Sequence, residues 1–170
     1  TTPGSNCGTG TVTLGATASA GTLSWFAAAS GGSALGTGTS FTTPSIASTT
    51  TYYVSATNGS CTSPTRSSVI ATINPRPTIS SSTPGSRCGT GTVLLGAASA
   101  TTINWFDALT GGSSLASGTS FTTPSIATTT TYYAEANNGT CTSASRTAVV
   151  ATVNSFPTIT STTPGSRCGT

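Results

Sequence analysis

The chain has 170 residues, of which 34% are hydrophobic and only 4% are charged, and its formal net charge is +3. It contains no histidine, and Asp107 and Glu135 are its only carboxylate residues. Without histidine or paired acids the usual catalytic dyads, triads and mixed-ligand metal sites are excluded, so we expect no enzyme and no cofactor. Its few arginines are spread out, which argues against nucleic-acid binding, and no apolar run reaches the roughly 20 residues of a membrane span.

The sequence repeats itself after about 80 residues. Most landmark residues recur 80 positions apart, whereas the first cysteine pair lies 81 apart. These landmarks are Trp25 and Trp105, Phe41 and Phe121, Tyr53 and Tyr133, Cys61 and Cys141, and Cys7 and Cys88. A last segment repeats the first residues once more. We therefore expect repeat 1 at 1–75 with its first strand missing, repeat 2 at 76–155, and the truncated start of repeat 3 at 156–170, as a window from a longer array.

Each repeat contains a series of strand signals in the same order. Roughly two-fifths of the residues are Ser or Thr, and with 20 Gly this composition favours strands joined by turns. In the first repeat a Gly-rich turn precedes the strand at 11–18, proline stops the strand at 40–46, and an Asn-Gly turn follows the strand at 49–59. The predicted strands are 11–18, 23–26, 40–46, 49–59 and 66–73, then 92–99, 103–106, 120–126, 129–139 and 146–153, with 77–83 and 157–163 opening new repeats.

This pattern predicts an all-β fold of tandem immunoglobulin-like sandwiches arranged end to end. About seven short strands in each repeat, with a tryptophan on the third and a tyrosine pair entering the sixth, are typical of that fold. We assign Trp25, Trp105, Tyr53 and Tyr133 to the core, because large aromatic residues in such strands usually pack there.

The cysteines predict disulfides and an oxidising compartment. There are two in each repeat, with Cys168 left over from the third, and the absence of CxxC pairs and histidine disfavours zinc. Two pairings stay open. One lies within repeats, Cys7 with Cys61 and Cys88 with Cys141. The other, which we prefer, joins adjacent repeats through Cys7 and Cys141, because the two cysteines of one sandwich are expected at opposite ends, roughly 25 Å apart.

Two sequences match the acceptor pattern for N-linked sugar. They begin at Asn58 and Asn138, and both are Asn-Gly turns as well. The turn already explains these residues, so glycosylation remains an alternative interpretation of them.

The motifs CGTGTVTLGATAS, GGSALGTGTSFTTPSI and TTTYYVSATNGSCTS carry a family resemblance. They resemble the immunoglobulin-like repeats of very large surface and secreted proteins of Bacteroidota, including adhesins of the gliding-motility kind, along almost the full length of both copies. The resemblance implies a β-sandwich, secretion to the cell surface, and service as a spacer, stalk or filament shaft. It transfers no catalytic residue.

The sequence thus favours a structural role outside the cell. We expect a stretch of extracellular fibre, stalk or giant adhesin that supplies length, stiffness and chemical resistance. The expected partners are neighbouring copies of the same repeat, with lateral association into a filament as an extension of this idea. Two alternatives stay open: a glycan- or surface-binding module using exposed Thr, Asn and aromatic residues such as Phe26 or Phe106, and a spacer in a secreted hydrolase.

Overall fold

The computed structural model describes residues 1–168, and this range contains strands and no helix. No segment of the described chain therefore has the long apolar helix that a membrane crossing requires. Contacts between residues divide the chain into two compact units. The first comprises residues 1–77 and 137–144, and the second comprises residues 78–136 and those from Ser145 onward.

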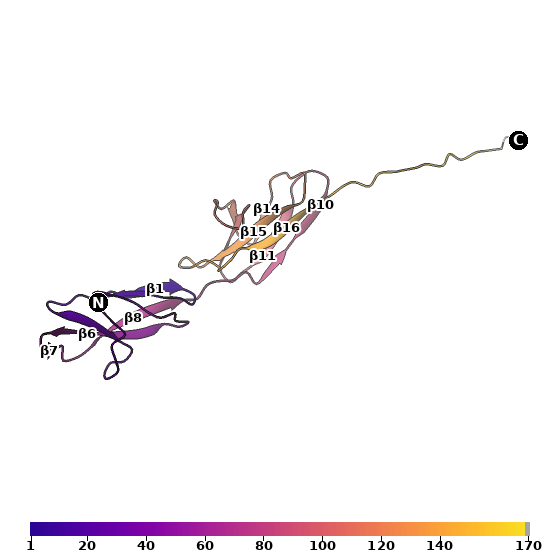
Figure 1. The fold of residues 1–170 in the computed structure, drawn as a ribbon. Coiled ribbons are helices and arrows are strands. Elements are labelled where there is room, and N and C mark those ends of the chain that lie inside the picture. Colours follow the sequence, from indigo (N-terminus) through magenta and orange to yellow (C-terminus); the bar gives the residue numbers. More distant parts are fainter. Residues whose placement is uncertain (169–170) are drawn as a thin grey trace. The chain divides into compact units, whose positions relative to one another are not determined.

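The first unit is a sandwich of two β-sheets (Figure 1). One sheet has the strand order β1-β8-β6-β3-β4, with β7 added to β6, and the other pairs β2 with β5. Neighbouring strands are antiparallel, except that β1 runs parallel to β8. The strands are β1 (Gly4–Cys7), β2 (Thr13–Gly15), β3 (Thr22–Phe26), β4 (Gly36–Thr37), β5 (Ser40–Thr42), β6 (Thr50–Asn58), β7 (Cys61–Thr62) and β8 (Ser67–Asn74).

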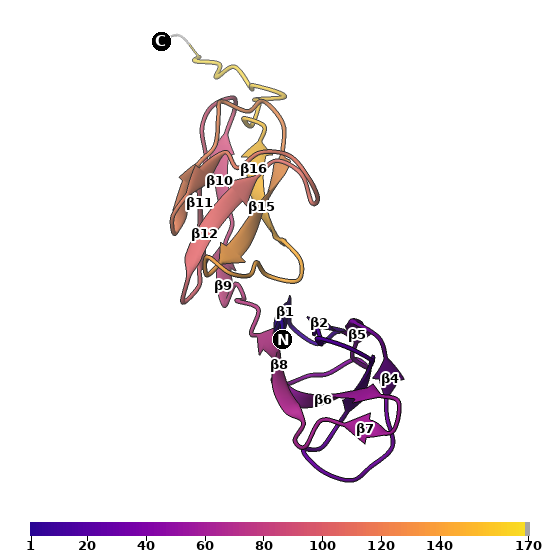
Figure 2. The same ribbon diagram turned by 90° about the vertical axis from the view of Figure 1, so that its left-hand side faces the viewer.

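The second unit repeats this plan with one more strand in the smaller sheet (Figure 2). The larger sheet has the order β10-β16-β15-β12-β13 and the smaller one β14-β11-β9. The strands are β9 (Ser81–Thr83), β10 (Gly85–Cys88), β11 (Leu94–Ala98), β12 (Thr102–Phe106), β13 (Ala116–Ser117), β14 (Ser120–Thr122), β15 (Thr130–Asn137) and β16 (Thr147–Asn154). Both units are therefore immunoglobulin-like β-sandwiches, the fold class predicted from the strand pattern.

The chain changes sheets between β9 and β10. Strand β9 pairs antiparallel with β11 in the smaller sheet, whereas β10 pairs parallel with β16 in the larger one. Proline at 84 cannot donate a backbone hydrogen bond, which interrupts the ladder at the crossing. At Gly85 a Cβ atom would collide with the carbonyl oxygen of Leu94, so only glycine lets the two backbones approach this closely.

A tryptophan lies at the centre of each core. Trp25 is fully buried, its Nε1 donates to the carbonyl of Gly38 at 2.9 Å, and its ring stacks on Phe41 with centroids 5.5 Å apart. Trp105 is also fully buried and makes the matching bond to Gly118 at 2.9 Å. The hydrogen bond satisfies the one polar atom of the indole, so the whole ring system is buried without an unpaired donor.

The assignment of Tyr53 and Tyr133 to the core was wrong. Both are half-buried, and the preceding tyrosines, Tyr52 and Tyr132, are the buried ones at 5% exposure each. Strand side chains alternate between faces, and Val54 lies two residues after Tyr52, so these two share the inner face. The two tyrosines are the same residue type, and the alternation with Val54 is the sequence signal that distinguishes them.

A buried threonine in each unit links two neighbouring strands of the smaller sheet, β5 with β2 and β14 with β11. Thr43 and Thr123 are each 2% exposed, and their hydroxyl oxygens accept the backbone N–H of Val12 at 3.0 Å and of Val93 at 2.9 Å. Each threonine directly precedes the proline that was predicted to stop the strand. Strands β5 and β14 both end at the residue before the threonine. The hydroxyl thus satisfies a buried backbone donor where strand pairing stops.

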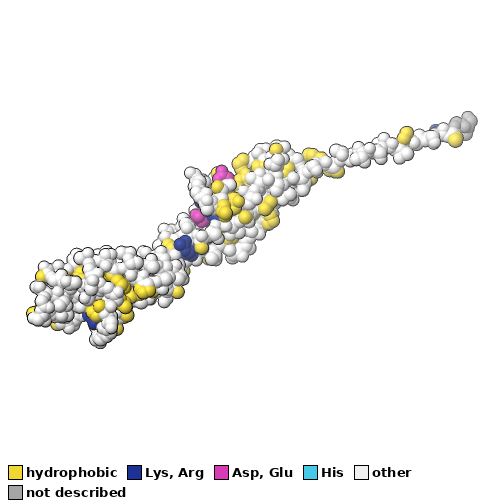
Figure 3. All heavy atoms as spheres, in the orientation of Figure 1, with side chains coloured by type: hydrophobic (Ala, Val, Ile, Leu, Met, Phe, Trp, Pro, Cys, Tyr) yellow, Lys and Arg dark blue, Asp and Glu magenta, His cyan; other side chains and the backbone are white. Residues whose placement is uncertain are grey.

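Residues 155–168, the described part of the final segment, contain no strand and are exposed (Figure 1). The expected start of repeat 3 at 156–170 stays a prediction, and its last residues, Gly169 and Thr170, lie outside the described range. On the face of the molecule drawn in Figure 3, charged side chains are few.

Candidate functional site

The register of the first unit separates Cys7 from Cys61. Cys7 ends β1 opposite Asn74, at the end of β8. Cys61 pairs with Asn58 at the other end of the same sheet. Along β6, Thr50 lies opposite Ala71, and Asn58 lies eight residues farther on, which is about 27 Å at 3.4 Å per residue. A disulfide within this repeat is therefore not available.

The hairpin at 137–144 holds the partner of Cys7. The side chain of Asn138 accepts the backbone N–H of Thr140 at 3.0 Å and that of Cys141 at 2.7 Å. The side chain of Asn137 accepts the N–H of Gly139 at 2.7 Å, and Gly139 has a positive φ of 87°. These local hydrogen bonds define the turn and fix the direction of the cysteine that follows it.

Cys7 and Cys141 form a disulfide inside the first unit. Their Cα atoms are 5.8 Å apart, a normal separation for a disulfide, and Cys141 is only 3% exposed. The two cysteines are 134 positions apart in the sequence, and the bond joins the first repeat covalently to the second. Of the two pairings considered from the sequence, the structure has the one between adjacent repeats.

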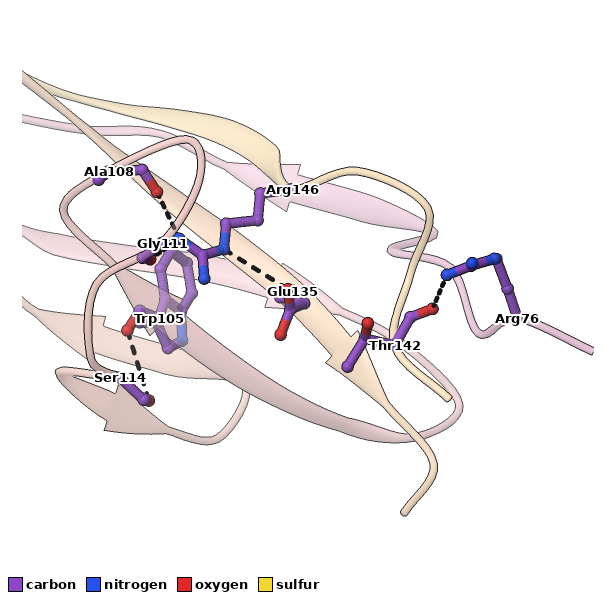
Figure 4. A network of polar contacts seen from close by, with 8 residues as sticks. All are labelled: Arg76, Trp105, Ala108, Gly111, Ser114, Glu135, Thr142 and Arg146. Carbon is purple, nitrogen blue, oxygen red and sulfur yellow. Dashed lines mark hydrogen bonds and ion pairs between the residues drawn. The ribbon is translucent and has the colours of Figure 1, made fainter. Parts of the chain in front are cut away.

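Arg76 connects the same two segments without a covalent bond. Its Nε donates to the carbonyl of Cys7 at 3.0 Å. Its Nη1 donates to the carbonyl of Thr142 at 3.1 Å (Figure 4). A third bond runs from Nδ2 of Asn138 to the carbonyl of Pro75 at 3.4 Å. Sequence analysis did not single out Arg76, because a lone arginine between two prolines carries no signal until its two acceptors are brought together.

The other three cysteines are unpaired and exposed. Cys88 ends β10 opposite Asn154, as Cys7 ends β1 opposite Asn74. Cys61 occupies the hairpin position that corresponds to Cys141, and Cys168 lies in the final segment. The structure therefore forms neither of the within-repeat pairs. The described residues also contain no group of three or more His, Cys, Asp or Glu side chains arranged to hold a metal ion.

An arginine covers an aromatic ring at the same place in each unit. The guanidinium carbon of Arg66 lies 3.3 Å from the ring centroid of Phe26, and that of Arg146 lies 3.3 Å from the centroid of Phe106. Phe106 is 6% exposed, so the prediction that its ring is available at the surface was wrong. The ring packs under the arginine because an aromatic face attracts the cation.

Each of these arginines also holds a loop. Nη1 of Arg146 donates to the carbonyls of Ala108 and Gly111 at 2.7 Å each, and Nε lies 3.5 Å from Oε2 of Glu135 (Figure 4). Arg66 makes the corresponding bonds to Ala28 and Gly31, also at 2.7 Å. The recurrence of arginine and of a Gly-Gly pair 80 residues apart is the sequence signal that was available for this contact.

An open groove of about 680 Å³ lies beside Phe26 and Arg66 in the first unit. Serine and threonine residues, including Ser24, Thr57 and Thr62, make up much of its lining. It is the place in the first unit that fits the alternative of glycan binding, although Arg66 covers a face of the ring on which a sugar would stack.

The two candidate glycosylation residues differ in their surroundings. Asn58 is exposed at the end of β6, and Asn138 is exposed in the hairpin that carries Cys141. The side chain of Asn138 participates in three hydrogen bonds, to Thr140, Cys141 and Pro75. Glycosylation stays a prediction at both residues. A sugar attached to Asn138 would disturb its three hydrogen bonds.

The sequence of both repeats matches one protein family. The model of the Ig_7 family, described as "Ig-like domain CHU_C associated", matches residues 1–75 and 76–155. The chain belongs to this Ig_7 family. No curated protein matches it.

Solved structures share the general architecture of this Ig_7 chain. It is similar to the fibronectin(III)-like modules of CbhA from Clostridium thermocellum, with 11% identity, a TM-score of 0.45, and coverage of 91% of this chain and 90% of that one. It is also similar to extracellular domains 3–5 of OTK from Drosophila, with 13% identity, a TM-score of 0.47, and coverage of 90% and 59%. At these identities and scores the likeness carries nothing about function.

Proposed function

We propose that the chain is a structural segment of an extracellular fibre, stalk or large adhesin of the gliding-motility kind. The observation that carries this proposal is the disulfide between Cys7 of the first repeat and Cys141 of the second. Tandem immunoglobulin-like domains of the Ig_7 family fit a structural or adhesin-type segment. Disulfides persist mainly in oxidising surroundings, which supports a place outside the cell.

The disulfide changes which residues carry a pulling force. The shortest covalent path along the chain enters at Thr1, reaches Cys7, crosses the sulfur atoms to Cys141 and continues to the final segment. The residues between the two cysteines, which are 134 positions apart, lie outside that path. Tension applied to the ends therefore cannot extend residues 8–140, even when their strands separate. A segment built in this way resists lengthening under load.

Single-molecule force spectroscopy tests this role directly. The chain is held at its two ends and stretched, with the Cys7→Ser/Cys141→Ser double variant as the matched control. Without the bond, unfolding should release roughly 470 Å of additional length, since an extended chain spans about 3.5 Å per residue over the 134 positions that separate the two cysteines. Equal released lengths in the two proteins would refute mechanical shielding, and with it the proposed role.

A second candidate is glycan binding in the groove beside Phe26. Its serine and threonine residues could bond the hydroxyls of a sugar, and its volume is about 680 Å³. Binding on a glycan array that disappears in Thr57→Ala/Thr62→Ala, and that does not need the disulfide, would support this candidate over the structural role. We rank it second because Arg66 occupies a face of the one aromatic ring in the groove.

A further inference from the structure

The second repeat provides its arginine with a carboxylate. Nε of Arg146 lies 3.5 Å from Oε2 of Glu135, and the two side chains point toward each other (Figure 4). Only 10% of the Arg146 side chain and 19% of the Glu135 side chain are exposed, so the pair is largely withdrawn from water. Attraction between opposite charges is stronger where water is excluded. The pair thus marks a carboxylate position beside the arginine.

The first repeat has the same arginine without the carboxylate. Arg66 covers the ring of Phe26 and donates from Nη1 to two backbone carbonyls, as Arg146 does in its own repeat. The residue that corresponds to Glu135, 80 positions earlier, is Ser55. Neither Nε nor Nη2 of Arg66 has an acceptor among residues 1–168. One side of this guanidinium therefore keeps its donors for a ligand.

The groove of about 680 Å³ lies at this vacant position. Ser55 and Arg66 both line it, and its volume falls within the roughly 300–1,000 Å³ of small-ligand sites. Ser55 is 7% exposed, and its hydroxyl has no hydrogen-bond partner among the described residues. Ser24, which also lines the groove, lies opposite Ser55 in the ladder of β3 with β6. An almost buried hydroxyl and an arginine thus face the same space.

The hairpin that forms one wall of the groove is a regular part of the repeat. Thr57 pairs with Thr62, and their hydroxyl oxygens are 3.0 Å apart. In the second repeat the corresponding residues, Asn137 and Thr142, form an antiparallel bridge in the hairpin that carries the disulfide. The hairpin therefore folds back at the same register in both repeats, and it does so when its cysteine is bonded.

No carboxylate of the first unit competes for Arg66. That unit is described throughout, and both acidic residues of the chain, Asp107 and Glu135, belong to the second unit. Arg66 already covers a face of the Phe26 ring, so a ligand gains more from charge and hydroxyl bonding than from stacking. The groove therefore suits a ligand that combines a carboxylate with several hydroxyls.

We propose that this groove binds an acidic sugar whose carboxylate lies beside Arg66, in the position that Glu135 takes beside Arg146. Uronic acids combine the two required groups on one ring. The carboxylate accepts from Nε of Arg66 and from the hydroxyl of Ser55, and the ring hydroxyls bond the other serine and threonine residues of the groove. This inference rests on the second candidate function, glycan binding, and is independent of the structural role.

Titration calorimetry of the full chain tests the class of ligand. The probes are trimers of galacturonate, mannuronate and glucuronate, each beside its methyl ester, which keeps the rings and removes the charge. We expect one uronate trimer or more to bind at a single site, and its ester to bind about tenfold more weakly or worse, because the charge-assisted bonds are lost. Binding of the acid should weaken as salt is added.

Triglutamate separates a sugar from a peptide as the source of the carboxylate. It carries the charge but no ring hydroxyls, so it should bind about tenfold more weakly than the best uronate trimer. Triglutamate that binds as tightly as the uronates would overturn the assignment to a sugar.

The Ser55→Glu variant gives Arg66 the carboxylate that Arg146 already has. The new side chain should fill the position from within the chain, keep the near-ultraviolet circular dichroism of the parent, and weaken uronate binding about tenfold or more. Ser40→Glu is the matched control, since Ser40 is exposed on β5 in the other sheet. It adds the same charge away from the groove and should bind as the parent does.

The outcomes separate this inference from the functions proposed above. Equal affinity for acid and ester would overturn the acidic ligand and leave glycan binding standing. Unchanged binding by Ser55→Glu would overturn the position beside Arg66, and if that variant does not fold, the comparison of acid with ester still decides. If no uronate trimer binds, the proposal fails, and the glycan array shows whether a neutral sugar keeps the second candidate. None of these results affects the length released under force.

Discussion

Single arginines do more in this chain than its low charge suggests. Arg66 and Arg146 each cover a phenylalanine ring and donate to two backbone carbonyls. Only Arg146 also has a carboxylate neighbour, Glu135, at 3.5 Å. The two units thus contain the same contact with and without an ion pair, which permits an internal comparison.

Arg146→Ala should destabilise the second unit by about 2–3 kcal/mol, because it removes a cation–π contact and two charge-assisted hydrogen bonds. Arg66→Ala should destabilise the first unit by less, the difference being the ion pair of Arg146, about 0.5–1 kcal/mol. Hydrogen exchange followed by mass spectrometry measures the loss of protection in each unit separately. Equal losses in the two variants would show that the Glu135 ion pair contributes nothing.

Tyr132 gives the second unit a pH dependence in alkaline solution. Burial raises the pKa of Tyr132 above its usual value of 10.0, and the negative charge of Asp107 adds to the effect. The folded state therefore holds this proton more tightly than the unfolded state. Its contribution to stability is complete below pH 10 and is lost as the pH rises from there through the raised pKa.

The Tyr132→Phe variant should lose less stability than the parent chain between pH 9 and about pH 11, because phenylalanine has no proton to lose. Urea unfolding midpoints of both proteins at the two pH values test this, with Asp107→Asn expected to show a smaller change in the same direction. An identical pH dependence in parent and Tyr132→Phe would contradict the assignment.

At the scale of elements, the hairpin at 137–144 shows how a short turn positions a covalent bond. Asn138 accepts two backbone N–H groups of the turn and donates to Pro75 in the first repeat. The matching hairpin of the first repeat contains Asn58, with Cys61 unpaired at its end. The two repeats thus contain similar hairpins, of which only the one at 137–144 bonds to another segment through its cysteine.

Asn138→Ala should shift the redox equilibrium of the Cys7–Cys141 bond about 5- to 30-fold toward the thiols, since losing these hydrogen bonds costs about 1–2 kcal/mol. Alkylation and mass spectrometry in glutathione buffers measure that equilibrium. Asn58→Ala, at the corresponding turn, should leave it unchanged. The same shift in both variants would mean that Asn138 has no special role in holding the hairpin.

The strands themselves were largely predictable, and the exceptions have a physical cause. The regular recurrence of Trp25 and Trp105, of the proline stops and of the Asn-Gly turns indicated the strand order of both repeats. The choice of Tyr53 over Tyr52 failed because a one-residue shift reverses the face of every side chain in a strand. The flanking residues carried the pattern that decides between the faces: Val54 and Ala56 share a face with Tyr52, whereas Ser55 and Thr57 share a face with Tyr53.

On the scale of the whole molecule, five arginines and no lysine leave trypsin-like proteases few sites to cleave. Four of the five arginines donate to backbone carbonyls: Arg66, Arg76, Arg87 and Arg146. The fifth, Arg167, lies in the exposed final segment, and a proline follows Arg76. Cleavage by trypsin therefore requires local unfolding everywhere except near the end of the chain.

Native trypsin digestion should cut rapidly after Arg167 and leave residues 1–167 intact, as measured by the mass of the whole protein. The reduced protein in denaturant should be cut after Arg66, Arg87 and Arg146 as well. Rapid cleavage after Arg66 or Arg146 in the native protein would show that these arginines are not held in the contacts described above.

The sequence alone determined that this chain consists of repeated β-sandwiches, because alternation, turn residues and an 80-residue period are local properties that each segment carries with it. It did not determine the partner of Cys7. The enclosed segments of about 54 and 134 residues differ in chain-closure entropy by less than about 1 kcal/mol, so sequence spacing cannot select between them. Only the tertiary structure decided it, since the parallel pairing of β1 with β8 separates Cys7 from Cys61, while the hairpin brings Cys141 within bonding distance.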